Sequence, residues 1–109
     1  MNKFEAVLLF SPDLSSPIIS QEEENFTNNL TDSEGKIIAN ENWGLRDLAF
    51  KINNYKKAFY KFYQIEIDGN KISDIKRILT QNEKILRHLF VKVENHQQLP
   101  TKMVSHEEK

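Results

Sequence analysis

The chain has 109 residues, no cysteine and a formal net charge of −1 at pH 7. Its length suits one domain, and 39% hydrophobic with 28% charged residues is a globular composition rather than a disordered one. The absence of cysteine excludes a disulfide framework and a thiolate metal site, and the charge excludes a general basic field that would draw the molecule onto nucleic acid or anionic membrane. Any nucleic-acid binding must therefore come from local patches.

The N-terminal part predicts a strand followed by a helix. Residues 3–10 are mostly apolar, and residues 11–13 have turn chemistry that ends the strand. The apolar run is too short to span a bilayer and lacks a small-residue cleavage site, so we expect a strand rather than a membrane segment or a signal peptide. A serine cap and Pro17 then favour the start of a helix, which is expected to end by Gly35.

Two incompatible strand phases meet in the segment 36–53. Because side chains alternate between faces with a period of two, a regular strand cannot switch phase, and Gly44 is where a bulge or bend costs least. We therefore predict one long, bent strand over residues 36–53, in which Leu48, Phe50 and Ile52 are core residues. The apolar residues at odd positions are Ile37, Ala39, Trp43 and Leu45, and those at even positions are Leu48, Phe50 and Ile52.

The remaining segments predict a strand, a helix and a strand. Residues 57–68 pair with the bent strand as a hairpin, through a turn at 54–56. Ile72, Ile75, Ile78 and Leu79 give the next segment an apolar face at helical spacing, and residues 85–94 form the last strand.

This order of elements specifies an α+β, ferredoxin-like split βαβ fold (βαββαβ), a four-stranded antiparallel sheet with two helices on one face. The domain is expected to span residues 1–94, and residues 95–109 are expected to form a polar, flexible C-terminal tail. The other face of the sheet then has no helix. Since residues 59–63 carry aromatic side chains on both faces of their strand, at least two large rings are expected on the uncovered face.

Catalytic and metal chemistry have little support in the sequence. His88, His96 and His106 are eight and ten residues apart, which is not a metal-ligand spacing, and the consecutive acids at 22–24 point in different directions around a helix. A glycine-rich phosphate loop and a serine, histidine and acid constellation are both absent from the sequence. We therefore expect no enzyme activity, no cofactor, no metal site and no small-molecule substrate.

Basic residues lie along the bent strand, around the hairpin and along the last strand. Cations beside aromatic rings suit RNA, because the cations meet phosphates while the rings stack on unpaired bases. Lysines scattered on a hairpin also aid solubility and protect strand edges, so both interpretations stay open. The glycine-flanked aromatic signature of RNA-recognition-motif domains is absent, which favours core packing or burial by a protein partner for the rings of residues 59–63. The basic residues are Arg46, Lys51, Lys56, Lys57, Lys61, Lys84, Arg87 and Lys92.

The segment from Gly44 to Asn53 combines a glycine, a basic residue, Leu-Ala, an aromatic residue and an isoleucine. With this segment, the chain resembles the bacterial small-subunit ribosomal protein number six family. Phe50 stands where that family usually has Tyr, and Lys51 replaces a Pro that is common in some members. Supporting matches follow in order over residues 3–93: Phe4-Glu5, Pro12-Asp13, Gly35-Lys36, Trp43, Tyr63-Gln64, Asn82 and Arg87.

The resemblance implies a structural component of the small subunit of a bacterial or organellar ribosome, with a cytoplasmic location and no membrane partner. It implies binding to the central domain of 16S-type ribosomal RNA (rRNA) as a pair with small-subunit ribosomal protein number eighteen. By similarity, the expected RNA contacts are Lys3, Arg46, Arg87 and Lys92, with Lys56 added from its charge alone. Candidates for the surface that meets the partner protein are Trp43, Phe59 and Tyr63, each of which also fits the core or an RNA contact.

Two alternatives stay open at this point. One is a free-standing ferredoxin-like regulatory or sensor domain that homodimerises through its open sheet face. A homodimer in solution would favour that domain, and a monomer would favour the ribosomal interpretation. The other is an enzyme of this fold, which would need a buried acid–base pair or an anion-binding loop, and the sequence has neither.

Overall fold

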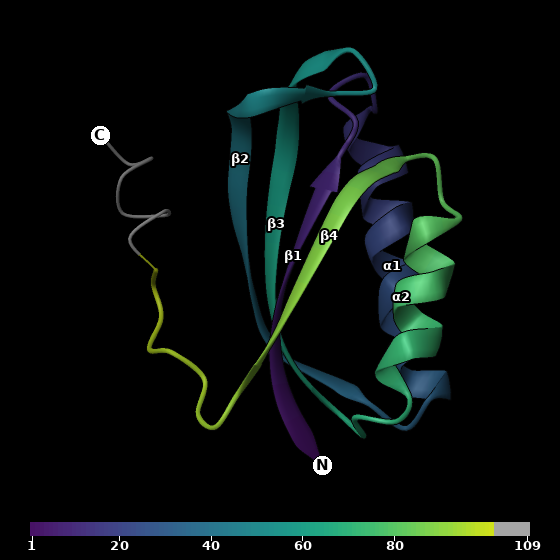
Figure 1. Cartoon of the computed structure of the whole chain (residues 1–109), viewed down its shortest axis with the longest axis vertical. Helices are drawn as coiled ribbons and strands as arrows, with labels where there is room; N and C mark the ends of the chain where they lie inside the picture. Colours follow the sequence, from purple (N-terminus) through teal and green to yellow (C-terminus); the bar gives the residue numbers. More distant parts are fainter. Residues whose placement is uncertain (102–109) are drawn as a thin grey trace.

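The computed structural model describes residues 1–101 and contains the predicted order of elements. Every strand pair is antiparallel, and the strand order across the sheet is β2-β3-β1-β4. Both helices lie on one side of the sheet (Figure 1). The ferredoxin-like βαββαβ prediction is therefore confirmed. In chain order the elements are β1 (Asn2–Phe10), α1 (Ser16–Asp32), β2 (Lys36–Ile52), β3 (Tyr55–Ile67), α2 (Ile72–Thr80) and β4 (Ile85–Val93).

Strand β1 shows how the sequence separates the two faces of the sheet. Its even-numbered residues from Phe4 to Phe10 are almost fully buried against the helices, as alternation along a strand requires. Each large side chain buried in this way stabilises the fold by roughly 1.5–3 kcal/mol. Its odd-numbered residues, from Lys3 to Leu9, point to the face without helices, which we call the open face. From the helices, the core receives Ile19, Phe26, Leu30, Ile72, Ile75 and Leu79.

The predicted distortion at Gly44 is confirmed. Gly44 has a φ of 78°, and the register between β2 and β3 shifts between Asn42 and Gly44. The Asn42 side-chain oxygen accepts a hydrogen bond from the Gly44 amide at 2.9 Å, which closes the local turn. After the shift, Leu45 lies opposite Phe59 on the helix side, whereas Trp43 lies on the open face. The bulge therefore moves the side chains of β2 from one phase to the other.

The prediction that Phe50 is a core residue is wrong. Its side chain is 84% exposed. Leu48 and Ile52, which were also predicted to be core residues, are half-buried but do not belong to the core cluster. Ladder pairing between β2 and β3 is interrupted between Asp47 and Ile52, so strict alternation does not apply to Phe50.

The hairpin turn begins one residue earlier than expected. Asn53 and Asn54 both have positive φ, and Ile52 pairs with Tyr55 across them. Two consecutive residues with positive φ are typical of the tight turns that join antiparallel strands. The cations on either side of this turn are therefore held close together.

Gly44→Ala is expected to lower the free energy of unfolding by about 1–2 kcal/mol, because a Cβ atom is strained at positive φ. Denaturant unfolding measures this change. Gly44→Asn is the matched variant, since asparagine tolerates the left-handed region better than alanine and should lose less stability. Equal losses in the two variants would contradict the backbone explanation.

Candidate functional site

The open face carries an aromatic and apolar surface. Trp43 stacks on Phe62 with ring centroids 5.0 Å apart and planes inclined by 9°. On the edge strand β4, Leu89 and Val91 are 46% and 59% exposed. They pair with open-face residues of β1, so their side chains also lie on the open face. These two residues were not among the sequence-based site candidates, although their odd-numbered alternation along β4 was a usable signal. A row of exposed apolar side chains on a sheet is typical of a protein interface.

A small apolar hollow lies where the β2–β3 hairpin approaches the open face. It has a volume of about 180 Å³ and includes Arg87 of β4 in its lining. The exposed ring of Phe50 and the half-buried ring of Tyr60 both line the hollow. This arrangement places a cation of β4 next to the hairpin. The lining residues are Leu9, Leu48, Ala49, Phe50, Ile52, Tyr60, Arg87 and Leu89.

Residues 94–101, which we call the strap, run back from the end of β4 on the side of the sheet opposite the helices (Figure 1). The Gln97 amide donates to the Glu5 carboxylate at 2.9 Å, and the Gln64 side chain donates to the Gln97 carbonyl at 2.8 Å. At its other end, Thr101 donates its amide and hydroxyl to the Glu41 carboxylate, at 3.0 and 2.6 Å. The segment expected to be a single tail is thus divided, because residues 95–101 lie against the sheet and residues 102–109 lie outside the described residues.

The carboxylate of Glu41 is the meeting point of the strap and the aromatic pair. It also accepts a hydrogen bond from the Trp43 indole at 2.9 Å. Burial raises the pKa of Glu41, but the hydrogen bonds from Thr101 and Trp43 outweigh this effect, so the pKa lies below its usual value. Glu41 is therefore ionised at neutral pH and holds its donors as charge-assisted hydrogen bonds.

The structure does not bring the five expected RNA contacts together. Arg46, Lys56 and Arg87 lie at the hairpin end of the sheet, on β2, β3 and the beginning of β4. Lys3 and Lys92 lie at the opposite end, on β1 and β4, where Lys3 pairs with Val93 and Lys92 pairs with Phe4, so their side chains point to opposite faces of the sheet. The rise along β1 separates the two groups by about 20 Å. The Arg46 guanidinium is partly held by the protein itself, since its Nε donates to the Trp43 carbonyl at 3.0 Å.

The hairpin end contains more cations than the expected contacts alone. Lys51 and Lys57 flank the turn as well, and Lys57 lies 3.4 Å from the exposed Asp47 carboxylate. Within residues 1–101, neither Lys51, Lys56 nor Arg87 forms an ion pair with a carboxylate, and all three are exposed. Exposed cations of this kind are available to phosphates. We call Arg46, Lys51, Lys56, Lys57 and Arg87 the hairpin cluster.

The three candidate partner contacts are also divided between the faces. Trp43 lies on the open face, whereas Phe59 packs against the core, and Tyr63 is 2% exposed beneath α1. The Tyr63 hydroxyl donates to Glu23 at 2.7 Å, and burial together with that carboxylate raises the pKa of Tyr63. Tyr63 is therefore turned towards the helices by alternation and is not accessible on the open face. The open-face rings of β3 are instead Tyr60 and Phe62.

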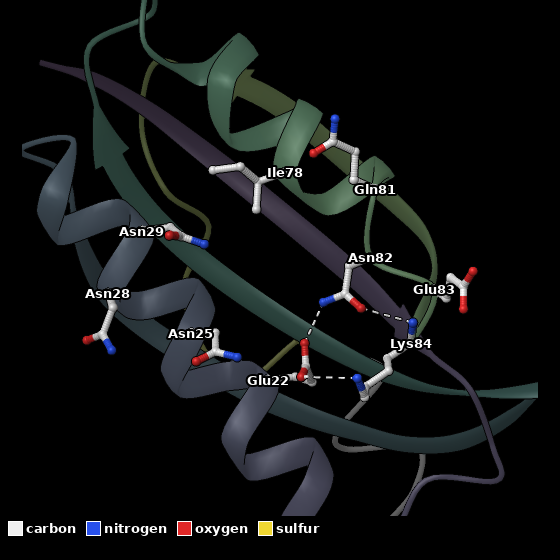
Figure 2. A pocket seen from close by; sticks show the side chains of 9 residues that line it. All are labelled: Glu22, Asn25, Asn28, Asn29, Ile78, Gln81, Asn82, Glu83 and Lys84. Carbon is white, nitrogen blue, oxygen red and sulfur yellow. Dashed lines mark hydrogen bonds and ion pairs between the residues drawn. The ribbon is translucent and has the colours of Figure 1, made fainter.

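A wide polar cleft of about 630 Å³ separates the C-terminal end of α2 from α1 (Figure 2). Figure 2 shows Asn82 and Lys84 pointing towards Glu22, which is buried. Asn82 donates a hydrogen bond to the Glu22 carboxylate, and Lys84 lies 4.0 Å from it. These groups satisfy one another, and neither a histidine nor a hydroxyl nucleophile lines the cleft, so it has no catalytic constellation. The lining residues are Glu22, Asn25, Asn28, Asn29, Ile78, Gln81, Asn82, Glu83 and Lys84.

Two further searches cover the part of the chain that the structure describes. Among residues 1–101, no group of three or more histidine or acidic side chains could hold a metal ion. Neither described helix is long and apolar enough to cross a membrane.

Comparison with known proteins agrees with the geometry. The family model described as Ribosomal protein S6 matches residues 3–92. The small ribosomal subunit protein bS6 of Rickettsia felis is 33% identical over 107 residues, which cover 98% of this chain and 88% of that protein. Its counterpart in Rickettsia prowazekii is 38% identical over 95 residues, covering 87% of this chain and 78% of that protein.

A solved structure supports the fold independently. The crystal structure of 30S ribosomal protein S6 from Thermotoga maritima matches with a TM-score of 0.79 and 16% sequence identity, covering 98% of this chain and 94% of that chain. At this identity, the match speaks for the fold alone. From the family model and the curated relatives, the chain belongs to the ribosomal protein S6 family, whose members are structural, non-catalytic proteins of the small subunit of the cytoplasmic ribosome.

Proposed function

We propose that the chain binds the central domain of 16S-type rRNA as a pair with small-subunit ribosomal protein number eighteen. The observation that carries this proposal is the hairpin cluster beside an open sheet face with exposed apolar side chains. The cations suit phosphates, whereas the apolar face suits a protein. The hairpin cluster and the apolar open face meet at one end of the sheet, and such a pair of surfaces suits an assembly of RNA with two proteins.

In this proposal, the hairpin cluster makes the main RNA contact. Lys56 and Arg87 reach phosphates from β3 and β4, and Arg46 adds a guanidinium that the Trp43 carbonyl holds in place. Lys3 and Lys92 make separate contacts at the other end of the sheet, one on each face, so the RNA would have to follow the edge of the domain. Of the predicted partner contacts, the proposal keeps Trp43, and it adds Leu89 and Val91 of β4.

Cooperativity follows from the charge balance. A net charge of −1 gives the isolated chain little long-range attraction for RNA. A basic partner would add phosphate contacts, and burial of Leu89 and Val91 would contribute at roughly 25 cal/mol per Å² of apolar area. Binding of each protein to the RNA would therefore strengthen binding of the other.

The isolated chain is expected to bind central-domain RNA roughly tenfold or more weakly than the pair with ribosomal protein number eighteen. Filter binding at one fixed salt concentration measures both affinities, and the pair should show the steeper salt dependence because it makes more phosphate contacts. Tight and salt-insensitive RNA binding by the isolated chain would contradict the proposal.

Fractionation of cell extracts gives an independent test. The chain should sediment with small ribosomal subunits and be released by high salt, since phosphate contacts are screened. A light-scattering mass of the free chain addresses the homodimer alternative, for which the same exposed apolar residues would be responsible. A stable homodimer that remains in the soluble fraction would favour the regulatory domain over the ribosomal role.

A further inference from the structure

The strap is held to the sheet mainly by two carboxylates from distant parts of the sequence. Glu5 of β1 accepts the Gln97 amide and the Gln97 side chain, both at 2.9 Å. Glu41 of β2 accepts both donors of Thr101. All of these donors are neutral groups. Within residues 1–101, no lysine or arginine side chain lies at ion-pair distance from either carboxylate.

From this arrangement we propose that the strap is a displaceable cover, and that an arginine-rich segment of a partner protein replaces it on Glu5, Glu41 and Trp43. The inference rests on the proposed function only for the identity of the partner. It adds the chemistry of the segment that docks, the place where it docks, and the part of this chain that must first leave.

Charge complementarity selects a basic occupant. A guanidinium binds a carboxylate with two parallel, charge-assisted hydrogen bonds, which are roughly twice as strong as those from neutral donors. Beside Glu41, the stacked Trp43 ring offers a π face to a cation. A segment with arginines could therefore satisfy both carboxylates better than the neutral amides and hydroxyl of the strap do.

The strap also contains a poorly satisfied group, which makes its displacement less costly. The His96 side chain is 13% exposed, and both of its ring nitrogens are buried without a hydrogen bond to a described residue. Its Nδ1 atom lies 3.5 Å from Glu5, as an ion pair that exists only when the ring is protonated. Buried polar atoms without hydrogen bonds cost free energy, which opposes closure of the strap.

Other occupants fit this part of the open face less well. RNA would bring phosphates towards Glu5 and Glu41, and like charges repel one another. The hairpin cluster at the other end of the sheet is the better surface for RNA. A second copy of the chain that docked here through the same surface would bring its own Glu5 and Glu41 to this site, so the two pairs of carboxylates would repel each other.

The test uses the full chain and its single tryptophan, Trp43, which lies beside the strap. Hexa-arginine amide is added stepwise at low salt, and binding is measured by the fluorescence of Trp43. Hydrogen exchange at the Gln97 and Thr101 amides is followed in parallel. We expect saturable quenching and faster exchange at both amides, because the strap leaves the two carboxylates when the peptide binds.

Two variants move the affinity in opposite directions. Thr101→Val removes the hydroxyl donor of the strap but leaves the Glu41 carboxylate intact, so the peptide should bind about tenfold more tightly. Glu41→Gln weakens the strap and the docking site together, so the peptide should bind about tenfold more weakly despite the looser strap. Thr27→Val is the matched control, since the Thr27 hydroxyl bonds only the Glu23 carbonyl within exposed α1, and its affinity should equal that of the unchanged chain.

Each remaining outcome overturns either this inference or the proposed pairing. The inference fails if the peptide leaves the Thr101 amide protected, if Thr101→Val and Thr27→Val bind equally, or if an RNA oligomer rather than the peptide releases the strap. If ribosomal protein number eighteen binds while the strap stays protected, the pairing stands and the inference fails. If the peptide displaces the strap but that protein does not bind, the inference stands and the pairing fails.

Discussion

A chain with the double substitution Lys56→Glu and Arg87→Glu is expected to bind central-domain RNA about 100-fold more weakly, as the pair with its protein partner. Both side chains are exposed, and neither pairs with a carboxylate among residues 1–101. Each change removes a phosphate contact and adds a charge that repels phosphate. The slope of log affinity against log salt concentration should also become shallower, by an amount that corresponds to about two lost phosphate contacts. Filter binding over a salt series measures both effects.

The matched control places the same change of charge on the helix side. Lys71→Glu with Arg77→Glu alters the net charge by the same amount, but both residues belong to α2 and its N-terminal cap, away from the hairpin. They pair with Glu34 and Asp74, and exposed pairs of this kind contribute little to stability. RNA affinity of this variant should stay within about threefold of the unchanged pair. Equal losses in both double variants would show that net charge, rather than the hairpin cluster, controls binding.

The sequence was sufficient for the fold because its strongest signals are local. Turn residues, apolar periodicity and Gly44 each act within a few neighbours, and together they specify the order of elements. The same alternation rule failed at Phe50, because pairing between β2 and β3 is interrupted there. Alternation predicts burial only where a continuous ladder fixes the orientation of each side chain.

The candidate site could be predicted in residue type but not in arrangement. Basic residues suited to RNA were visible in the sequence, but only the register between β1 and β4 shows that Lys3 and Lys92 lie far from Arg87. The strap could not be predicted, because its polar composition is that of an ordinary tail. Its anchors, Glu5 and Glu41, come from opposite parts of the chain, and no local pattern connects them to it.

Phe26→Ala is expected to lower the free energy of unfolding by about 3–5 kcal/mol, since it creates a cavity in the centre of the core. Phe26 is 1% exposed, and its ring centroid lies 5.0 Å from that of Tyr63 and 6.5 Å from that of Phe90. A domain of this size is stable by only about 5–15 kcal/mol, so this loss would consume a large part of it. Chemical denaturation at constant temperature measures the change.

Phe50→Ala is the control that separates burial from residue type, because it removes the same ring from a site that is 84% exposed. Its effect on the free energy of unfolding should stay within about 0.5 kcal/mol. A loss comparable with that of Phe26→Ala would mean that Phe50 is buried in solution, as the even-numbered phase of the sequence predicted. A small effect at Phe50 with a large one at Phe26 would instead show that the Phe26 ring belongs to the core in solution and that the Phe50 ring lies outside it.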